Sequence, residues 1–282
     1  PAVAYLWART VKCKNCRATI PLLKTRWLCR KDKKRVLLTI KNGGPGTAVS
    51  FAIEHDVPVV GANPAQRREH DRRIGSGTMS RAGVTCPCCG AIVTRDDLQQ
   101  EARLGRLGSM MTAVVVAGEE GKEYRLPRPE EIEPLQDLEL LVARLFDAIP
   151  FGMPTEPLTL DAKGNTWCVL YGVDELGKLF TRRQLYALGT FVRLVREAHG
   201  ALRGKGYDPN WTEAIQAYLA CAIDRLADRG STVCTWTDGW DKIRNTFVRF
   251  ALPMTWDYAE CSAIEDSSGG FPGAVEWVAR FL

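Results

Sequence analysis

The stretches Cys13-Lys14-Asn15-Cys16 and Cys86-Pro87-Cys88-Cys89-Gly90 decide the fold of the first third of the chain. Each stretch places two cysteines three positions apart, so that one tight turn presents two sulfur atoms. Two such turns supply the four sulfur ligands of a closed tetrahedral zinc site, which leaves the metal no open position for water or substrate. The pattern therefore predicts a structural Zn²⁺ ion that stabilises the fold and performs no chemistry. Its predicted ligands are Cys13, Cys16, Cys86 and Cys89.

The pattern has two irregular features. Gly90 follows the second cysteine pair and suits a tight turn, whereas Arg17 follows the first. The two pairs are separated by 69 residues, far more than a minimal zinc-binding ribbon needs. Cys88 is an alternative ligand, and a redox pair or plain buried thiols are the alternative interpretations of the cysteines. The scattered cysteines are predicted to be small core residues; they are Cys29, Cys168, Cys221, Cys234 and Cys261.

Composition predicts a globular chain. It has 282 residues, of which 45% are hydrophobic, enough for a sizeable core in one large or two ordinary domains. No apolar run is long enough to span a bilayer, and no signal-peptide pattern opens the chain, so no membrane partner is expected. Ten cysteines with a metal-binding pattern and no export signal predict a cytoplasmic location.

Charge is divided unevenly along the chain. Residues 1–90 carry 17 Lys and Arg against 5 Asp and Glu, whereas residues 91–282 carry 21 against 28. Such a basic segment is typical of a surface that binds the phosphates of nucleic acid, here double-stranded DNA. The alternative is a solubilising surface on a small domain. The predicted DNA contacts are Lys31, Lys33, Lys34, Arg35, Arg67, Arg68, Arg72 and Arg73.

Hydrophobic patterning predicts an α+β fold, with a β-rich zinc-ribbon module at residues 1–127 and a mainly helical region at 128–282. Residues 1–12 are interpreted as an apolar lead into the first cysteine pair, and 61–80 as a mobile basic loop. Strands are expected at 35–40, 48–53, 112–117, 123–126 and 166–171. Helices are expected at 129–146, from 181 and from 210, around 244–249 and at 272–282. The last apolar helix carries no stop signal, which suggests an excised piece of a longer chain.

Six phrases of the sequence resemble one family, the large adenine-specific DNA methyltransferases that contain a zinc ribbon. The resemblance covers nearly the whole chain, in order. The phrases are residues 5–13 (YLWARTVKC), 81–90 (RAGVTCPCCG), 179–185 (LFTRRQL), 244–247 (RNTF), 251–257 (ALPMTWD) and 267–270 (SSGG).

This resemblance implies an enzyme that transfers a methyl group from S-adenosylmethionine to the exocyclic amine of adenine in DNA. The family's cofactor loop, Phe-x-Gly-x-Gly, and its catalytic Asp-Pro-Pro-Tyr motif do not occur in this chain. The chain alone is therefore expected to be inactive and to hold neither catalytic nor cofactor-binding residues. It corresponds to the segment between those motifs, whose acidic helical half would pack on the missing methyltransferase core. The alternative is a stand-alone zinc-ribbon protein that binds nucleic acid or acts as a scaffold without enzymatic activity.

Overall fold

The computed structural model describes residues 1–44, 49–133, 136–161, 164, 166–248, 251–267 and 269–281. It is a mixed structure with antiparallel sheets, in agreement with the predicted α+β class. Several sequence-based predictions fall on residues outside the described ranges, namely Pro45, Gly46, Ala48, Leu135, Arg249, Ser268 and Leu282.

The central sheet joins the two ends of the sequence. Its strand order is β12 (Asp257–Cys261), β1 (Ala2–Lys12), β8 (Gly108–Gly118) and β9 (Gly121–Arg125), with the short β2 (Thr19–Pro21) also pairing with β1. Residues 1–12 lead into the first cysteine pair as expected, and they do so as strand β1, which pairs with β12, β2 and β8. Ala4, Leu6 and Ala8 are buried on one face while the alternating residues between them are half-exposed, the two-residue period of a strand.

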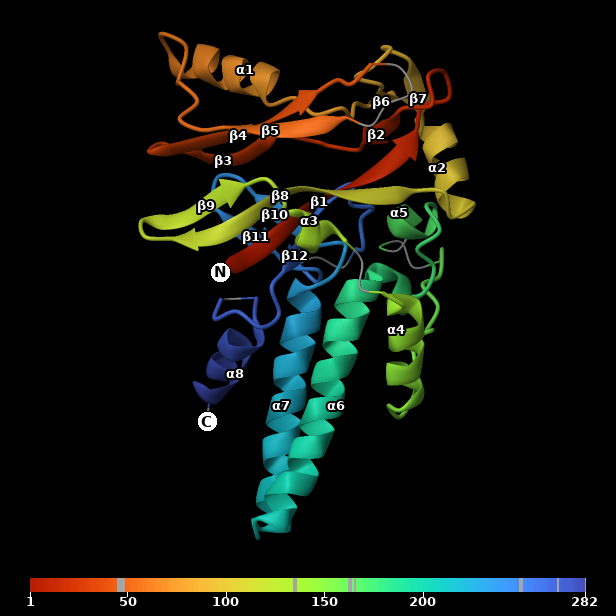
Figure 1. The fold of residues 1–282 in the computed structure, drawn as a ribbon, viewed down its shortest axis with the longest axis vertical. Helices are drawn as coiled ribbons and strands as arrows, with labels where there is room; N and C mark the ends of the chain where they lie inside the picture. Colours follow the sequence, from red (N-terminus) through yellow and green to blue (C-terminus); the bar gives the residue numbers. More distant parts are fainter. Residues whose placement is uncertain are drawn as a thin grey trace.

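A second sheet packs against the first. It consists of β3 (Trp27–Lys31), β4 (Lys34–Lys41) and β5 (Ser50–Glu54), which confirms the strands predicted at 35–40 and 48–53 to within their ends. One buried cluster unites the facing side chains of both sheets, including Leu6 and Val115 from the first and Leu38 from the second. Figure 1 shows helix α1 (Pro64–Ile74) lying over the outer side of this second sheet.

The prediction of a mobile loop at 61–80 is wrong, since α1 occupies most of it. Asn63 caps the helix by accepting a hydrogen bond of 2.9 Å from the backbone N–H of Gln66. The helix is held to the sheet by polar contacts rather than by an apolar stripe: the indole of Trp27 donates to the carbonyl of Asp71 at 3.0 Å. A helix anchored in this way lacks the apolar periodicity on which the prediction depended.

The rest of the N-terminal part contains the second cysteine pair. A hairpin of β6 (Gly83–Thr85) and β7 (Ile92–Thr94) leads into α2 (Arg95–Arg103), and the predicted hairpin at 112–126 is confirmed as β8 and β9. Thr94 and Asp97 form a reciprocal capping box that starts α2.

The C-terminal part is mainly helical. Two long antiparallel helices, α6 (Arg182–Gly204) and α7 (Pro209–Arg229), project away from the sheets (Figure 1), and both were predicted. The other helical elements are α3 (Pro129–Ile132), α4 (Leu138–Asp147), α5 (Thr166–Val169), the short 3₁₀ helix Leu176–Leu179 and α8 (Phe271–Ala279). A short hairpin of β10 (Thr235–Thr237) and β11 (Lys242–Arg244) follows α7.

Three predictions in this part are wrong. The single helix at 129–146 is two helices, because Asp137 adopts a left-handed backbone conformation (φ 57°) before α4. The expected strand at 166–171 begins as helix α5, since a short apolar run does not distinguish a strand from a buried helix. The expected helix at 244–249 starts as β11 and continues as a turn, which the side chain of Asp228 holds by accepting from the backbone N–H of Phe247 at 2.9 Å.

The predicted domain division between residues 127 and 128 stays a prediction. In space, β12 of the second half belongs to the sheet of β1, through pairs such as Trp7 with Tyr258.

Candidate metal centre and adjoining pocket

The two cysteine turns have the same local structure. Each joins a pair of antiparallel strands with the same register, since Lys12 pairs with Thr19 and Thr85 pairs with Ile92. In both turns the backbone N–H of the first cysteine donates at 2.8 Å to a carbonyl five residues later, on Ala18 or Ala91. We call β1–β2 and β6–β7, with their turns, the knuckle hairpins.

The irregular residue after the first cysteine pair is accommodated. Arg17 adopts a left-handed conformation with φ 62°, close to the φ 74° of Gly90 at the corresponding position of the second turn. The left-handed region costs a non-glycine residue about 1 kcal/mol, so Arg17 is held there by the turn. The Cys-Arg sequence therefore yields the same turn as Cys-Gly, at a cost in backbone energy.

The four predicted ligands come together at the point where the knuckle hairpins face each other. Their sulfur atoms all lie within 4.8 Å of one another. The Sγ atoms of Cys13 and Cys89 are 3.6 Å apart, and those of Cys16 and Cys86 are 3.7 Å apart. Four sulfurs at about 2.3 Å from a tetrahedral Zn²⁺ are separated by about 3.8 Å. The four cysteines can therefore hold a metal ion, with a spacing that suits zinc.

Burial and backbone hydrogen bonds act on the thiols of the cluster in opposite directions. The backbone N–H of Ala91 lowers the pKa of Cys89 to about 6, whereas burial raises the pKa of Cys86 to about 12. A buried thiolate is costly unless a positive charge compensates it, and a divalent metal ion held by the four cysteines would supply that charge. Cys88 is half-buried beside the site but does not belong to the four-sulfur group of the described residues.

The four-sulfur cluster is embedded in the core rather than attached to its surface. Val11, Ile20 and Val84 are fully buried around it. Trp256, from the segment that leads into β12, completes the same buried cluster. A metal ion held there would therefore support the central sheet as well as the two turns.

The predicted DNA contacts separate into two groups. The first group lies on the β3–β4 hairpin, and three of its four side chains, those of Lys31, Lys34 and Arg35, bind other residues of the protein. Lys31 forms an ion pair of 3.1 Å with Asp241, and Lys34 donates to the carbonyl of Lys122. Arg35 is 9% exposed and binds Asp71 with two hydrogen bonds. Lys33 is the exposed member of this group.

The second group lies on one helix. Arg67, Arg68, Arg72 and Arg73 are all exposed on α1, and we call these four residues the α1 arginines. Arg72 pairs with Glu69 one turn earlier at 2.6 Å, an exposed pair of small energetic value. Figure 1 shows α1 on the same side of the molecule as the β6–β7 hairpin and opposite α6 and α7. The structure thus gathers four of the eight predicted contacts on one element.

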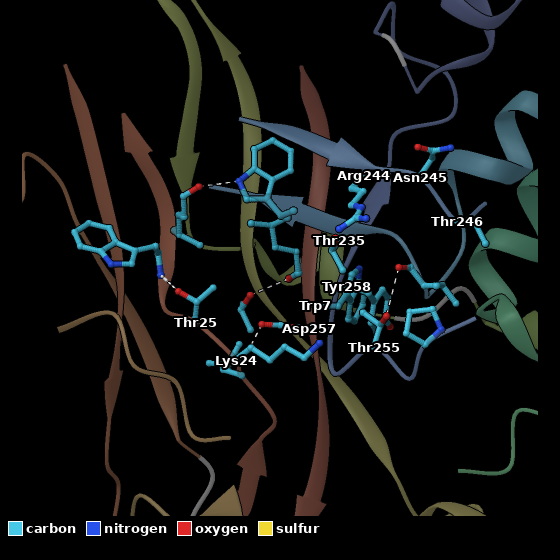
Figure 2. Close-up of a pocket in the computed structure, with 18 of the residues that line it drawn as sticks. Trp7, Lys24, Thr25, Thr235, Arg244, Asn245, Thr246, Thr255, Asp257 and Tyr258 are labelled. Carbon is cyan, nitrogen blue, oxygen red and sulfur yellow. Dashed lines mark hydrogen bonds between the residues drawn. The ribbon is translucent and has the colours of Figure 1, made fainter. Parts of the chain in front are cut away.

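A pocket of about 430 Å³ opens between the two sheets and the β10–β11 hairpin. Figure 2 shows Asp257 facing Lys24, whose backbone N–H donates to the Asp257 carboxylate at 3.0 Å. Burial raises the pKa of Asp257, although this backbone contact lowers it in part. Arg244 and Asn245 line the opposite side.

The pocket assembles parts of three phrases that carry the family resemblance. Trp7 belongs to the phrase at residues 5–13, Arg244 to that at 244–247 and Asp257 to that at 251–257. The sequence alone does not connect Arg244 and its neighbours with Asp257. Their common place in the pocket depends on the pairing of β12 with β1, for which the sequence carries no local signal.

No family model, no curated protein and no solved structure matches this chain. In the described part of the chain, no helix is both long and apolar enough to cross a lipid bilayer.

Proposed function

We propose that this chain is the zinc-stabilised, DNA-contacting segment of an adenine-specific DNA methyltransferase. The observation that carries the proposal is the four-sulfur cluster, which lies in the same N-terminal part of the chain as the exposed arginines of α1. Zn²⁺ would be structural, held by Cys13, Cys16, Cys86 and Cys89. S-adenosylmethionine would bind only to the rest of the enzyme.

The exposed arginines of α1 support a nucleic-acid contact. Arg67, Arg68 and Arg73 expose guanidinium groups that are suited to phosphate oxygens. Such contacts position a protein on the duplex without reading its sequence. An enzyme that modifies a base must turn it out of the helix, so it needs a firm grip on the flanking backbone. In this proposal the α1 arginines supply that grip.

Exposed aromatic side chains support the proposal that another structural unit covers part of the helical half. Trp211 on α7 is 68% exposed, and Phe281, just beyond α8, is 76% exposed. Contiguous exposed apolar surface is typical of a face that another structural unit covers, and Phe281 lies against the partly exposed Trp277 of α8. We assign these surfaces to contacts with the methyltransferase core of the same chain.

The enzyme part of the proposal is tested by reading the gene on both sides of this segment. An in-frame Phe-x-Gly-x-Gly codon run upstream and Asp-Pro-Pro-Tyr downstream are expected. The full-length product should then methylate adenine in duplex DNA. Flanking start and stop codons without these motifs would contradict the proposal and leave a stand-alone zinc-ribbon protein.

A further inference from the structure

The turn of the β10–β11 hairpin presents an exposed tryptophan. Trp240 is 75% exposed, the largest exposed fraction of any tryptophan in the described part of the chain. Tryptophan side chains are mostly buried in folded proteins, because the indole ring has a large apolar surface. Single exposed apolar residues are common, but Trp240 is distinguished by how firmly its turn is held and by the charges around it.

The hairpin is fixed to the second sheet through β3. The indole of Trp236 donates to the carbonyl of Leu28 at 2.7 Å. The carbonyl of Asp238 accepts the backbone N–H of Arg30 at 2.9 Å, and the Asp238 carboxylate pairs with the Arg30 side chain at 3.1 Å. Trp236 and Ile243 also pack against the buried cluster that unites the two sheets. One side of the hairpin is therefore bound to the core.

The residue that follows Trp240 is held still more closely. Asp241 is 5% exposed and adopts a left-handed conformation with φ 56°. Its carboxylate accepts from Lys31 at 3.1 Å and from the hydroxyl of Tyr124, and its carbonyl accepts from Lys122 at 2.5 Å. A left-handed residue other than glycine persists only where its surroundings determine it. These contacts thus fix the backbone from which the Trp240 side chain projects.

The exposed surface of the hairpin is basic. The two carboxylates of the turn are already neutralised by the ion pairs from β3. On β11, Lys242 and Arg244 are exposed on either side of the half-buried Ile243. Neither of them forms an ion pair with a residue of the described chain. The Nζ of Lys242 lies 5.3 Å from the centroid of the Trp240 ring. An exposed indole therefore lies beside cations that have no anionic partner.

A nucleic acid has the chemistry that complements this surface. A base stacks its flat face on an aromatic ring, and the phosphates beside it attract Lys242 and Arg244. A lysine over one face of the Trp240 ring leaves the other face for a base. Bases inside a duplex are already stacked on their neighbours, so only a base that has left the stack can use the ring. A purely apolar partner would leave the two cations without counter-charges.

We propose that the β10–β11 turn binds an unpaired base of DNA, which stacks on Trp240 while Lys242 and Arg244 bind the neighbouring phosphates. This inference rests on the proposed function and deepens it, because an enzyme that turns a base out of the duplex creates unpaired bases at its target. The α1 arginines and this turn then have different tasks. The first grip the backbone of paired DNA, and the second receives an unpaired base.

The test uses the full, metal-loaded chain and two single strands of equal length and charge. One strand consists of about 12 thymidine nucleotides, within the site size of single-strand binders. The other consists of abasic tetrahydrofuran nucleotides, which keep every phosphate but carry no base. Fluorescence anisotropy should show the thymidine strand binding about fivefold or more tightly, because stacking adds to the phosphate contacts. Equal binding of the two strands, or no binding of either, would overturn the proposal.

Variants locate the contact. Trp240→Ala should bind both strands with the affinity of the abasic one. Trp211→Ala is the matched control, since it removes an indole that is 68% exposed on α7, and it should keep the preference for thymidine. Lys242→Gln combined with Arg244→Gln should weaken the binding of both strands and reduce the salt slope by roughly 1–2. With folding checked by circular dichroism, a thymidine preference that survives in Trp240→Ala would contradict the proposal.

Photocrosslinking examines the unchanged protein. A strand that carries 5-iodouracil in place of thymine forms covalent bonds under ultraviolet light with aromatic side chains that it contacts. Mass spectrometry should find the crosslink at Trp240. Crosslinks that spare Trp240 and occur at Trp211 would show that the base binds elsewhere.

The outcomes for this turn and for α1 are independent. If removal of the α1 arginines leaves duplex binding unchanged while the thymidine preference persists, the role of α1 fails and that of Trp240 stands. If the α1 variant loses duplex affinity while Trp240→Ala keeps the thymidine preference, only the role of Trp240 fails.

Discussion

Single residues in the knuckle hairpins carry identifiable energetic costs. Arg17 and Gly90 occupy equivalent left-handed positions, with φ 62° and 74°. Arg17→Gly should raise the free energy of unfolding by about 1 kcal/mol, because glycine relieves the backbone penalty. Gly90→Ala should lower it by a similar amount, since no atom would contact the added Cβ and only the backbone term changes. Urea unfolding of the metal-loaded protein measures both, and shifts of the same sign would contradict the equivalence of the turns.

Asp97 gives a pH dependence of known sign. Its ion pair with Lys14 and its place in the α2 capping box lower its pKa to about 2. A carboxylate with a lowered pKa stabilises the folded state above its unfolded pKa of about 4, and this contribution disappears as the pH falls toward 2. Asp97→Asn should therefore cost about 0.5 kcal/mol at pH 7, a small value because the pair is exposed.

The cost of Asp97→Asn should shrink as the pH is lowered from about 4 toward 2. The measurement is the difference between the urea midpoints of the two proteins, in which the shared contribution of the metal cancels. A difference that grows on acidification would contradict the assignment.

At the scale of elements, α1 depends on one buried ion pair. Arg35 binds Asp71 with two hydrogen bonds and keeps the pKa of that carboxyl below its usual value, although burial alone raises it. Arg35→Ala leaves Asp71 as a buried charge without its partner, which should cost roughly 3 kcal/mol and loosen the helix. Lys33→Ala, two residues away and exposed, is the control and should have almost no effect.

Hydrogen exchange reports the loosening directly. In Arg35→Ala the amides of α1 should exchange faster than those of the distant α6. Uniform acceleration in both helices would show that the pair stabilises the whole fold rather than α1.

At the scale of the whole molecule, the metal should stabilise the central sheet. Chelation is expected to lower the melting temperature by about 10 °C or more, because the cluster lies in a core shared with β1. Cys89→Ser should reduce zinc content and melting temperature, whereas Cys88→Ser should change neither. Metal analysis and calorimetry test this, and equal effects of the two substitutions would contradict the assigned ligand set.

The sequence predicted those parts of the molecule whose signals are local. The cysteine spacing identified the four clustered sulfurs, and the capping box at Thr181 marked the start of α6. It did not predict that Arg35 is buried, because its partner Asp71 lies 36 residues away in a segment without apolar periodicity. Nor did it predict the pocket between the two sheets, since this depends on the pairing of β12 with β1 across the whole chain.

The most direct test of the account compares duplex DNA binding by two triple variants of equal charge. One removes α1 arginines (Arg68→Gln, Arg72→Gln, Arg73→Gln), and the other removes exposed basic residues at the far end of α6 (Arg196→Gln, Arg203→Gln, Lys205→Gln). Fluorescence anisotropy over a range of salt gives the affinity and the number of phosphate contacts. The α1 variant should lose about tenfold or more in affinity and reduce the salt slope by roughly 2–3, while the α6 variant should bind as the unchanged protein does. Equal losses in the two variants would contradict the assignment of α1 as the DNA-contacting element.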